Sequence, residues 1–256
     1  MTLASHGYLS GDHPVGWAFT DRHGGVTPAP FNSLNLAGDA VGLRANIQRL
    51  IAAVGLSQLA WCRQSHSNRV AVIDQAMQLL DLSANPTLAL SPGPEVDALV
   101  TRQTGVGLLV RVADCVPVIL ADSAAGVIAV AHAGRVGLLS GVLEATMAAM
   151  FGLGAVKLTA WIGPHVCPSC YEVPDQMADA AASILPASRA CSRSGTKAID
   201  LGAGVAAVLG EHDVVVHRHD PCTCCGGKTD FYSYRRDGAA SGRQGALVWM
   251  EPIAAG

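Results

Sequence analysis

Four short apolar segments in the middle of the chain are separated by Gly, Asp and Ser, a pattern that predicts buried β-strands. They cover residues 97–101, 107–112, 117–121 and 127–131. Three more segments of the same kind predict strands at 157–162, 214–216 and 246–250.

Apolar residues at helical spacing predict the remaining elements. An amphipathic helix is expected over 43–54, ended by Gly55. Its apolar positions are Leu43, Ile47, Leu50, Ile51 and Val54. A glycine turn is expected at 133–137.

A further helix should follow this turn, and two others are expected near 175–184 and 201–209. The helix after the turn has an apolar face of Leu139, Val142, Leu143, Met147 and Met150. Strands and helices mixed in this order predict an α+β (mixed α/β) fold, a layered sandwich of helices on mixed sheets. The Pro-, Ser- and Gly-rich segment 82–94 indicates a surface loop rather than a domain joint. We therefore expect one domain over residues 1–256.

Composition excludes several classes of protein. Half of the 256 residues are apolar, 14% are charged, and the formal net charge is −3. Nucleic-acid binders and polybasic membrane binders need clustered positive charge, and disordered chains have fewer apolar residues. The apolar stretch 112–133 is interrupted by Asp114 and Asp122, so no membrane segment is expected. The first residues lack a basic and apolar leader pattern, so the expected compartment is the cytoplasm.

Polar residues at the ends of apolar strands are the first candidates for chemistry, because their burial is costly unless they are paired or bind a metal. Asp114 and Cys115 end one such segment, and His132 ends another. If the two strands are neighbours, Cys115 and His132 would suit either a zinc site or a Cys–His nucleophile pair. A buried, inert cysteine is the alternative. His66 lies in a polar loop, and the residues alone do not make it a better candidate for a functional role than the other histidines.

A set of motifs in fixed order adds further information. They read RHGGVTPAPFNSLNLAGD, WCRQSHSNRV, DALVT, ADCVPVILAD, VAHAGRVG, WIGPHVCPSCYEV and CTCC followed by DFYSYRRDGAASGR. Together they resemble the YfiH-type family, whose members are known as polyphenol oxidoreductase or "laccase" domain proteins, purine nucleoside phosphorylases and peptidoglycan editing factors. The resemblance implies one zinc ion held by His66, Cys115 and His132. Three such ligands leave a fourth position for water or substrate, as in catalytic zinc sites.

The resemblance also implies roles for other residues. Cys115, His132 and Asp114 form the expected catalytic set, with Asp114 orienting a ligand or moving a proton. The expected substrate-binding residues are Arg22, Ser33, Asn35, Gln64, Arg135, Phe231 and Arg235. In the family the turn after the second zinc histidine commonly reads HAGWRG, whereas this chain has HAGRVG, so Arg135 would supply the cation from the neighbouring position. Gly134 and Gly137 in this turn could expose backbone N–H groups to a phosphate.

The implied activity is zinc-dependent phosphorolysis of purine nucleosides, including methylthioadenosine, together with deamination of adenosine. The partners would be a nucleoside and phosphate, with no nucleic acid and no membrane, and the chain would act as a monomer or homodimer. An amidase that edits peptidoglycan precursors is the alternative. A copper-dependent polyphenol oxidase is less favoured, because among nine histidines only His217 and His219 form an HxH pair. A zinc-stabilised binding protein without activity is a third interpretation.

The remaining cysteines raise a separate hypothesis. Cys167 and Cys170 form a CPSC pair, and Cys222, Cys224 and Cys225 form a CTCC cluster. These two groups would bind a second, structural zinc ion if the fold brought them together. The alternative is that they belong to family segments that need no metal.

Overall fold

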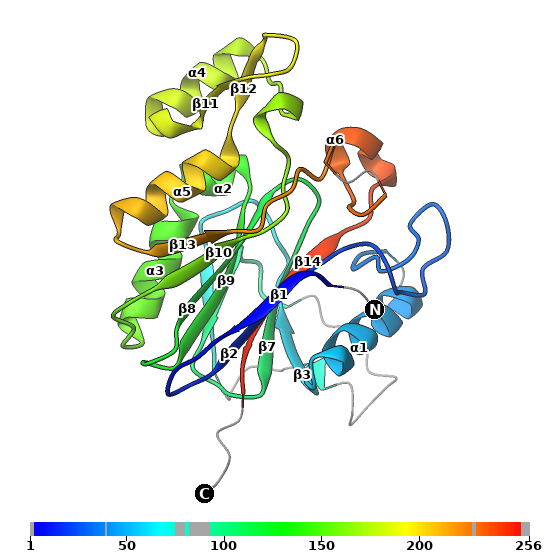
Figure 1. Ribbon diagram of the computed structural model, residues 1–256, viewed down its shortest axis with the longest axis vertical. Coiled ribbons are helices and arrows are strands. Elements are labelled where there is room, and N and C mark those ends of the chain that lie inside the picture. Colours follow the sequence, from blue (N-terminus) through cyan, green and yellow to red (C-terminus); the bar gives the residue numbers. More distant parts are fainter. Residues whose placement is uncertain (1–2, 39, 75–79, 82–92, 227–228, 252–256) are drawn as a thin grey trace, which may run out of the picture.

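The computed structural model describes residues 3–38, 40–74, 80–81, 93–226 and 229–251. Two six-stranded sheets pack face to face, and helices cover both outer faces (Figure 1). Most of the predicted surface loop, residues 82–92, lies outside the described residues. Among the described helices, none is both long enough and apolar enough to cross a bilayer.

The first sheet combines strands from both ends of the chain. Its order is β1 (Leu3–Leu9), β2 (Val15–Thr20), β14 (Gln244–Met250), β7 (Val106–Val112), β3 (Gln58–Trp61) and β5 (Leu80–Asp81). Neighbours run antiparallel except β3 and β7, which are parallel. Helix α1 (Ala40–Ala53) covers its outer face.

The second sheet carries most of the predicted strands. Its order is β13 (Val215–Arg218), β10 (Thr159–Ile162), β8 (Val116–Asp122), β9 (Val127–Ala133), β6 (Ala98–Thr101) and β4 (Val70–Ile73). Three helices pack on its outer face: α2 (Arg135–Leu139), α3 (Val142–Gly152) and α5 (Leu201–Glu211).

Smaller elements lie at one end of the sandwich. Helix α4 (Asp175–Ile184) packs against the two-stranded ribbon β11 (Arg189–Cys191) and β12 (Lys197–Ile199). Helix α6 (Tyr234–Asp237) and short 3₁₀ turns at Pro168–Cys170, Pro186–Ser188 and Gly238–Ala240 complete the fold.

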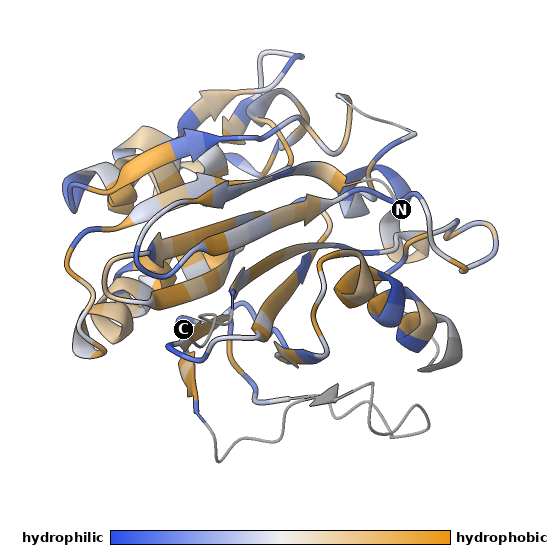
Figure 2. Ribbon diagram, turned by 60° about the horizontal axis from the view of Figure 1, so that its bottom comes forward, coloured by the Kyte–Doolittle hydropathy of each residue, from blue (hydrophilic) through white to orange (hydrophobic). Residues whose placement is uncertain are grey.

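The side chains of the central strands explain why their sequences are apolar throughout. In β8, Val118 and Leu120 pack against the helix layer, whereas Ile119 and Ala121 pack between the sheets. Figure 2 shows the apolar colour running along these inner strands. Strands buried on both faces lose the alternation of polar and apolar residues. The predicted α+β sandwich with mixed sheets is therefore confirmed.

The structure differs from the sequence prediction in three respects. Strands β1 to β5, β11 and β12 were not predicted. In β1 the exposed positions are Ala4, His6 and Tyr8, so polar and apolar residues do not alternate, and β3 to β5, β11 and β12 are only two to four residues long. The expected single helix after the glycine turn is two helices, since Gly141 adopts a left-handed conformation with φ 89° between α2 and α3. The turn itself is also shorter than expected, because α2 begins at Arg135.

Candidate metal centre and substrate cavity

Three turns at one end of the sandwich bring His66, Cys115 and His132 together. His66 lies in the loop between β3 and β4, Cys115 in the turn between β7 and β8, and His132 near the end of β9. Strands β8 and β9 are antiparallel neighbours, with Pro117 opposite His132. The three ligand atoms lie within 4.8 Å of one another, and Cys115 Sγ is 3.7 Å from His66 Nε2.

Two of these turns contain residues in an uncommon backbone conformation. His66 has φ 60° and Asp114 has φ 87°, a region that residues other than glycine rarely adopt. Such conformations persist only where surrounding contacts impose them, and they are frequent at functional sites. These two turns place the side chains of His66 and of Cys115, which follows Asp114, beside His132.

One buried carboxylate, that of Asp97, fixes two of the three candidate ligands. Asp97 precedes β6, is 0% exposed, and lies 2.8 Å from His132 Nδ1. It also accepts hydrogen bonds from the backbone N–H groups of Ser65, His66 and Ser67. Burial alone would raise the pKa of Asp97, but the bonds from His132 and Ser67 hold this pKa well below its ordinary value.

The ionised Asp97 determines which ring nitrogen of His132 is free to bind a metal. A carboxylate only accepts hydrogen bonds, so His132 Nδ1 carries the proton and Nε2 faces Cys115 and His66. Metal-binding histidines commonly donate their second ring N–H to a carboxylate in this way. Asp97 was not among the predicted site residues, although an acidic residue at the start of an apolar strand is a weak signal of such a role.

Cys115 and His132 shift each other's titration in opposite directions. Burial would raise the pKa of the Cys115 thiol, but the imidazoles of His132 and His66 lower it below its ordinary value. Burial would lower the pKa of His132, but the Cys115 sulfur and Asp97 raise it. The site therefore favours an anionic sulfur, which is the form of cysteine that binds metals.

Gly134 leaves the space that this cluster occupies. A Cβ atom at Gly134 would lie 2.7 Å from His66 Cδ2 and 3.1 Å from Cys115 Sγ. We expect Gly134→Ala to weaken metal binding by about 10-fold or more, because overpacking of this kind costs about 1–3 kcal/mol. Chelator competition measures the affinity. Gly152→Ala is the control, since a Cβ there has no neighbour within 4 Å. Equal metal affinity of Gly134→Ala and the unmodified protein would contradict this prediction.

A cavity of about 850 Å³ opens onto the three residues. Its size is in the range of small-molecule sites. Besides His66, Cys115 and His132, its lining includes two tyrosines, Tyr171 and Tyr234. Gln64 also lines it, and both polar atoms of its side-chain amide bond the backbone of Arg111 at 2.7 and 2.9 Å.

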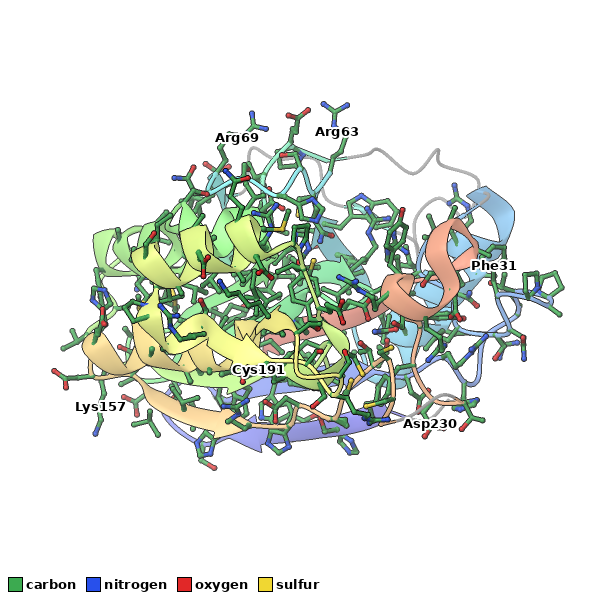
Figure 3. The ribbon with its side chains drawn as sticks, turned by 90° about the horizontal axis from the view of Figure 1, so that it is seen from above. Phe31, Arg63, Arg69, Lys157, Cys191 and Asp230 are labelled. Atoms are coloured by element: carbon green, nitrogen blue, oxygen red, sulfur yellow. The ribbon has the colours of Figure 1, made fainter. Side chains whose placement is uncertain are left out.

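Four arginines give this cavity a positive lining in a chain whose net charge is negative. They are Arg63, Arg111, Arg235 and Arg243. Arg111 lies over the ring of Trp61, and Arg243 donates to the carbonyls of Ser241 and Gly242. Arg63 pairs with Glu95 at the rim, where Figure 3 shows it pointing outward. Of these four arginines only Arg235 was predicted to bind substrate, because isolated arginines form no sequence pattern.

Arg235 and Tyr171 are neighbours in the lining of the cavity. The guanidinium of Arg235 lies 5.0 Å from the centre of the Tyr171 ring. Arg135, at the start of α2, is close enough to Tyr171 to oppose the rise in its pKa that burial and Cys115 cause. Arg135 does not belong to the described residues that line the cavity, so its contact with a substrate stays a prediction.

Asp114 supports the cavity wall with both carboxylate oxygens. Its Oδ1 accepts from Thr223 Oγ1 at 2.7 Å and its Oδ2 accepts from the Arg235 backbone N–H at 2.5 Å. The carboxylate that contacts a candidate ligand is therefore Asp97, whereas Asp114 joins the turn of Cys115 to the segment of Arg235. A proton-transfer role for Asp114 stays a prediction.

Five of the expected substrate-binding residues lie outside the described residues that line this cavity. They are Arg22, Ser33, Asn35, Arg135 and Phe231. The Arg22 guanidinium donates to the carbonyls of Pro30 and Asn32 and lies over the ring of Tyr232. Direct contact of these five with a substrate stays a prediction.

Ser33 and Asn35 bond mainly to nearby backbone. Ser33 Oγ accepts from the N–H of Gly25. Asn35 Oδ1 accepts from the N–H of Ala37 and of Arg243, which both line the cavity. Asn35, which does not line the cavity itself, therefore holds the backbone of two residues that do.

The donor set fits a zinc ion. Two imidazoles and one thiolate are nitrogen and sulfur ligands of the kinds that bind zinc, and three protein ligands with an open fourth position follow the pattern of catalytic zinc sites. Zinc is one metal that such nitrogen and sulfur donors select, and copper is another. The Asp97–His132 contact supplies the outer hydrogen bond that orients a ligand.

The fold and this site define a class of protein: a sandwich of two mixed sheets with a candidate His₂Cys metal centre beneath a cationic cavity. The sequence matches the family described as "Multi-copper polyphenol oxidoreductase laccase" over residues 16–251, so the chain belongs to that family.

Two relatives and one solved structure illustrate the likeness. "Purine nucleoside phosphorylase ORF3" of Streptomyces griseus is 41% identical, over 92% of this chain and 94% of the relative. "Adenosine deaminase RL5" from an unknown prokaryotic organism is 37% identical, over 83% of this chain and 85% of the relative. The crystal structure of the hypothetical protein YfiH of Bacillus licheniformis has a TM-score of 0.80 at 24% identity and covers 93% of each chain, which shows the shared fold. The resemblance to YfiH-type proteins is thus confirmed.

Proposed function

We propose that this chain is a zinc-dependent purine nucleoside phosphorylase that also deaminates adenosine and accepts methylthioadenosine. The observation that carries the proposal is the placement of His66, Cys115 and His132 in one cavity with four arginines. The names of the two relatives support an enzyme of purine metabolism.

The arginines favour phosphorolysis as the main reaction. Guanidinium groups bind phosphate through charge-assisted hydrogen bonds. Phosphate in this cavity would attack the anomeric carbon of the ribose while the bond from that carbon to the purine nitrogen breaks, and the purine leaves with a proton. Deamination and amide hydrolysis need no bound phosphate.

The tyrosines, the candidate metal ligands and Asp97 would have different roles in the proposed reaction. Tyr171 and Tyr234 would stack on the purine, since Tyr234 is 55% exposed and free to contact a ligand. Zinc held by His66, Cys115 and His132 would supply Lewis-acid and water-activating chemistry. Asp97 would hold His132 in its binding tautomer.

Zinc is proposed rather than copper because of the ligands that the structure brings together. Within the described residues, the groups able to hold a metal are this one and a cluster of four cysteines. Multi-copper chemistry requires several imidazole-rich sites, and the first group offers two imidazoles. His217 and His219 lie against Trp161 and Trp17 instead.

Product analysis tests the proposal. Zinc-loaded protein should convert inosine and phosphate to hypoxanthine and ribose 1-phosphate, and adenosine to adenine or inosine. Chromatography of the products with and without phosphate separates phosphorolysis from deamination. Absence of all these products at every zinc occupancy would overturn the proposal.

An amidase is the second candidate, favoured by one observation. The mutual titration shifts of Cys115 and His132 also suit a thiolate–imidazolium nucleophile pair. Release of an amino acid from a peptidoglycan precursor by metal-free protein, without nucleoside turnover, would favour this reaction.

Arg235 provides a test of phosphate binding. We expect Arg235→Met to raise KM for phosphate about 10- to 100-fold, because a hydrogen bond to a charged group contributes about 1.5–3 kcal/mol. KM for the nucleoside should change less. Steady-state kinetics with varied phosphate measure both constants. The matched control is Arg49→Met, an exposed arginine on α1. An unchanged KM for phosphate in Arg235→Met would exclude Arg235 as a phosphate ligand.

A further inference from the structure

Two Cys-x-x-Cys segments that are distant in sequence meet beside the cavity. Cys167 and Cys170 flank the 3₁₀ turn at Pro168–Cys170, and Cys222 and Cys225 lie in the loop after β13. The four sulfur atoms lie within 4.8 Å of one another, and Cys167 Sγ is 3.8 Å from Cys225 Sγ.

The backbone around the cluster stabilises an anionic sulfur at one of the four cysteines, Cys222. The N–H groups of Cys167 and Cys225 point at Cys222 Sγ, at 3.3 and 3.4 Å. Hydrogen bonds to the charged form of a group stabilise that form. Cys222 also forms an isolated parallel bridge with His165, so backbone pairing fixes the two segments against each other.

The pattern and the geometry together distinguish a metal site from a chance cluster. Paired Cys-x₂-Cys segments are the ligand spacing of structural zinc sites. All eight cysteines are free thiols in the structure, so no disulfide already accounts for the cluster. The neighbouring Cys224 lies in the same loop and is buried to a similar degree, but its sulfur is not one of the four that cluster together.

We propose that Cys167, Cys170, Cys222 and Cys225 bind one structural zinc ion, separate from the His66–Cys115–His132 centre. Four thiolates fill a tetrahedral zinc sphere and leave no position for water or substrate. The second ion therefore has no part in the chemistry of the proposed function. Its role is to hold the two segments together.

This structural zinc ion would stabilise one wall of the cavity. Thr223, inside the second Cys-x-x-Cys segment, is fully buried and donates to Asp114. Its carbonyl accepts from the Arg236 side chain, and its N–H donates to the carbonyl of His165. Through Thr223 the four-cysteine cluster is joined to the turn that carries Cys115.

Zinc content of variants tests the proposal. Protein purified from zinc-supplemented medium and dialysed should hold two zinc ions per chain by elemental analysis. The Cys167→Ser/Cys225→Ser variant and the Cys115→Ala variant should each hold one, and their combination none. Cys224→Ser and Cys191→Ser, the controls, should hold two. One zinc per chain in the unmodified protein that is lost entirely on Cys115→Ala would overturn the proposal.

Alkylation of the unmodified protein gives a readout that does not depend on the folding of a variant. With zinc bound, the four cysteines should resist iodoacetamide, and chelation should make them reactive, whereas exposed Cys191 should react in both states. Mass spectrometry of peptides locates the modified thiols. Equal labelling before and after chelation, or a disulfide within the cluster, would contradict the proposal. In the Cys115→Ala background, chelation should still lower Tm, because metal that binds only the native state stabilises it. This result does not depend on nucleoside turnover.

Discussion

Cys115→Ala is expected to lower kcat/KM for phosphorolysis by about 10³-fold or more. Loss of one of three ligands would remove a bound cation whose contribution to the transition state is several kcal/mol, and about 4 kcal/mol corresponds to this factor. The variant should also lose one zinc ion per chain. Product formation and elemental analysis measure the two effects on the same preparation.

The control for this variant is Cys191→Ala. Cys191 is exposed on β11 and contributes to neither group of candidate ligands, so activity and zinc content should not change. A Cys115→Ala protein that keeps its zinc and its activity would show that the Cys115 thiolate is not a ligand. A folded variant that keeps zinc but loses turnover would support the nucleophile role instead.

Asp97→Ala is expected to lower the free energy of unfolding by about 3–5 kcal/mol and to weaken zinc binding about 10- to 100-fold. The change removes one partner of a buried pair and leaves the N–H groups of Ser65, His66 and Ser67 without their acceptor. Urea denaturation measures the stability, and chelator competition measures the zinc affinity.

The Asp122→Ala variant separates the effect on the free energy of unfolding from the effect on zinc affinity. Asp122 is 4% exposed and also accepts several backbone hydrogen bonds, from Ala124, Ala125, Val156 and Lys157, but it contacts none of the candidate ligands. This variant should lose stability while its zinc affinity remains. If Asp97→Ala and Asp122→Ala bound zinc equally well, Asp97 would have no role in orienting His132.

Among the strands, β6 to β9 were predicted because burial on both faces leaves a continuous apolar segment. The helices were predicted instead from apolar residues at helical spacing. Strand β1 lies at a sheet edge with Ala4, His6 and Tyr8 exposed, so it has neither a continuous apolar segment nor a regular alternation of polar and apolar residues. The break between α2 and α3 depends on the left-handed conformation of one residue, Gly141, which periodicity does not reveal.

The residues of the candidate site were also predicted only in part. The resemblance selected His66, Cys115 and His132, and the structure brings them together. Asp97 precedes an apolar strand, which is a weak local signal, but its partner His132 is distant in sequence. The arginines at 111 and 243 have no such signal, because only the fold brings them into the cavity lining. The resemblance also selected Arg22 and Ser33, but their side chains form hydrogen bonds to the backbone of their own loop rather than line the cavity.

A zinc titration of metal-free protein tests the central claim most directly. Phosphorolysis of inosine should be absent without metal, rise with the zinc bound by His66, Cys115 and His132, and stay absent in Cys115→Ala at every zinc concentration. Full activity of the metal-free protein would contradict the claim.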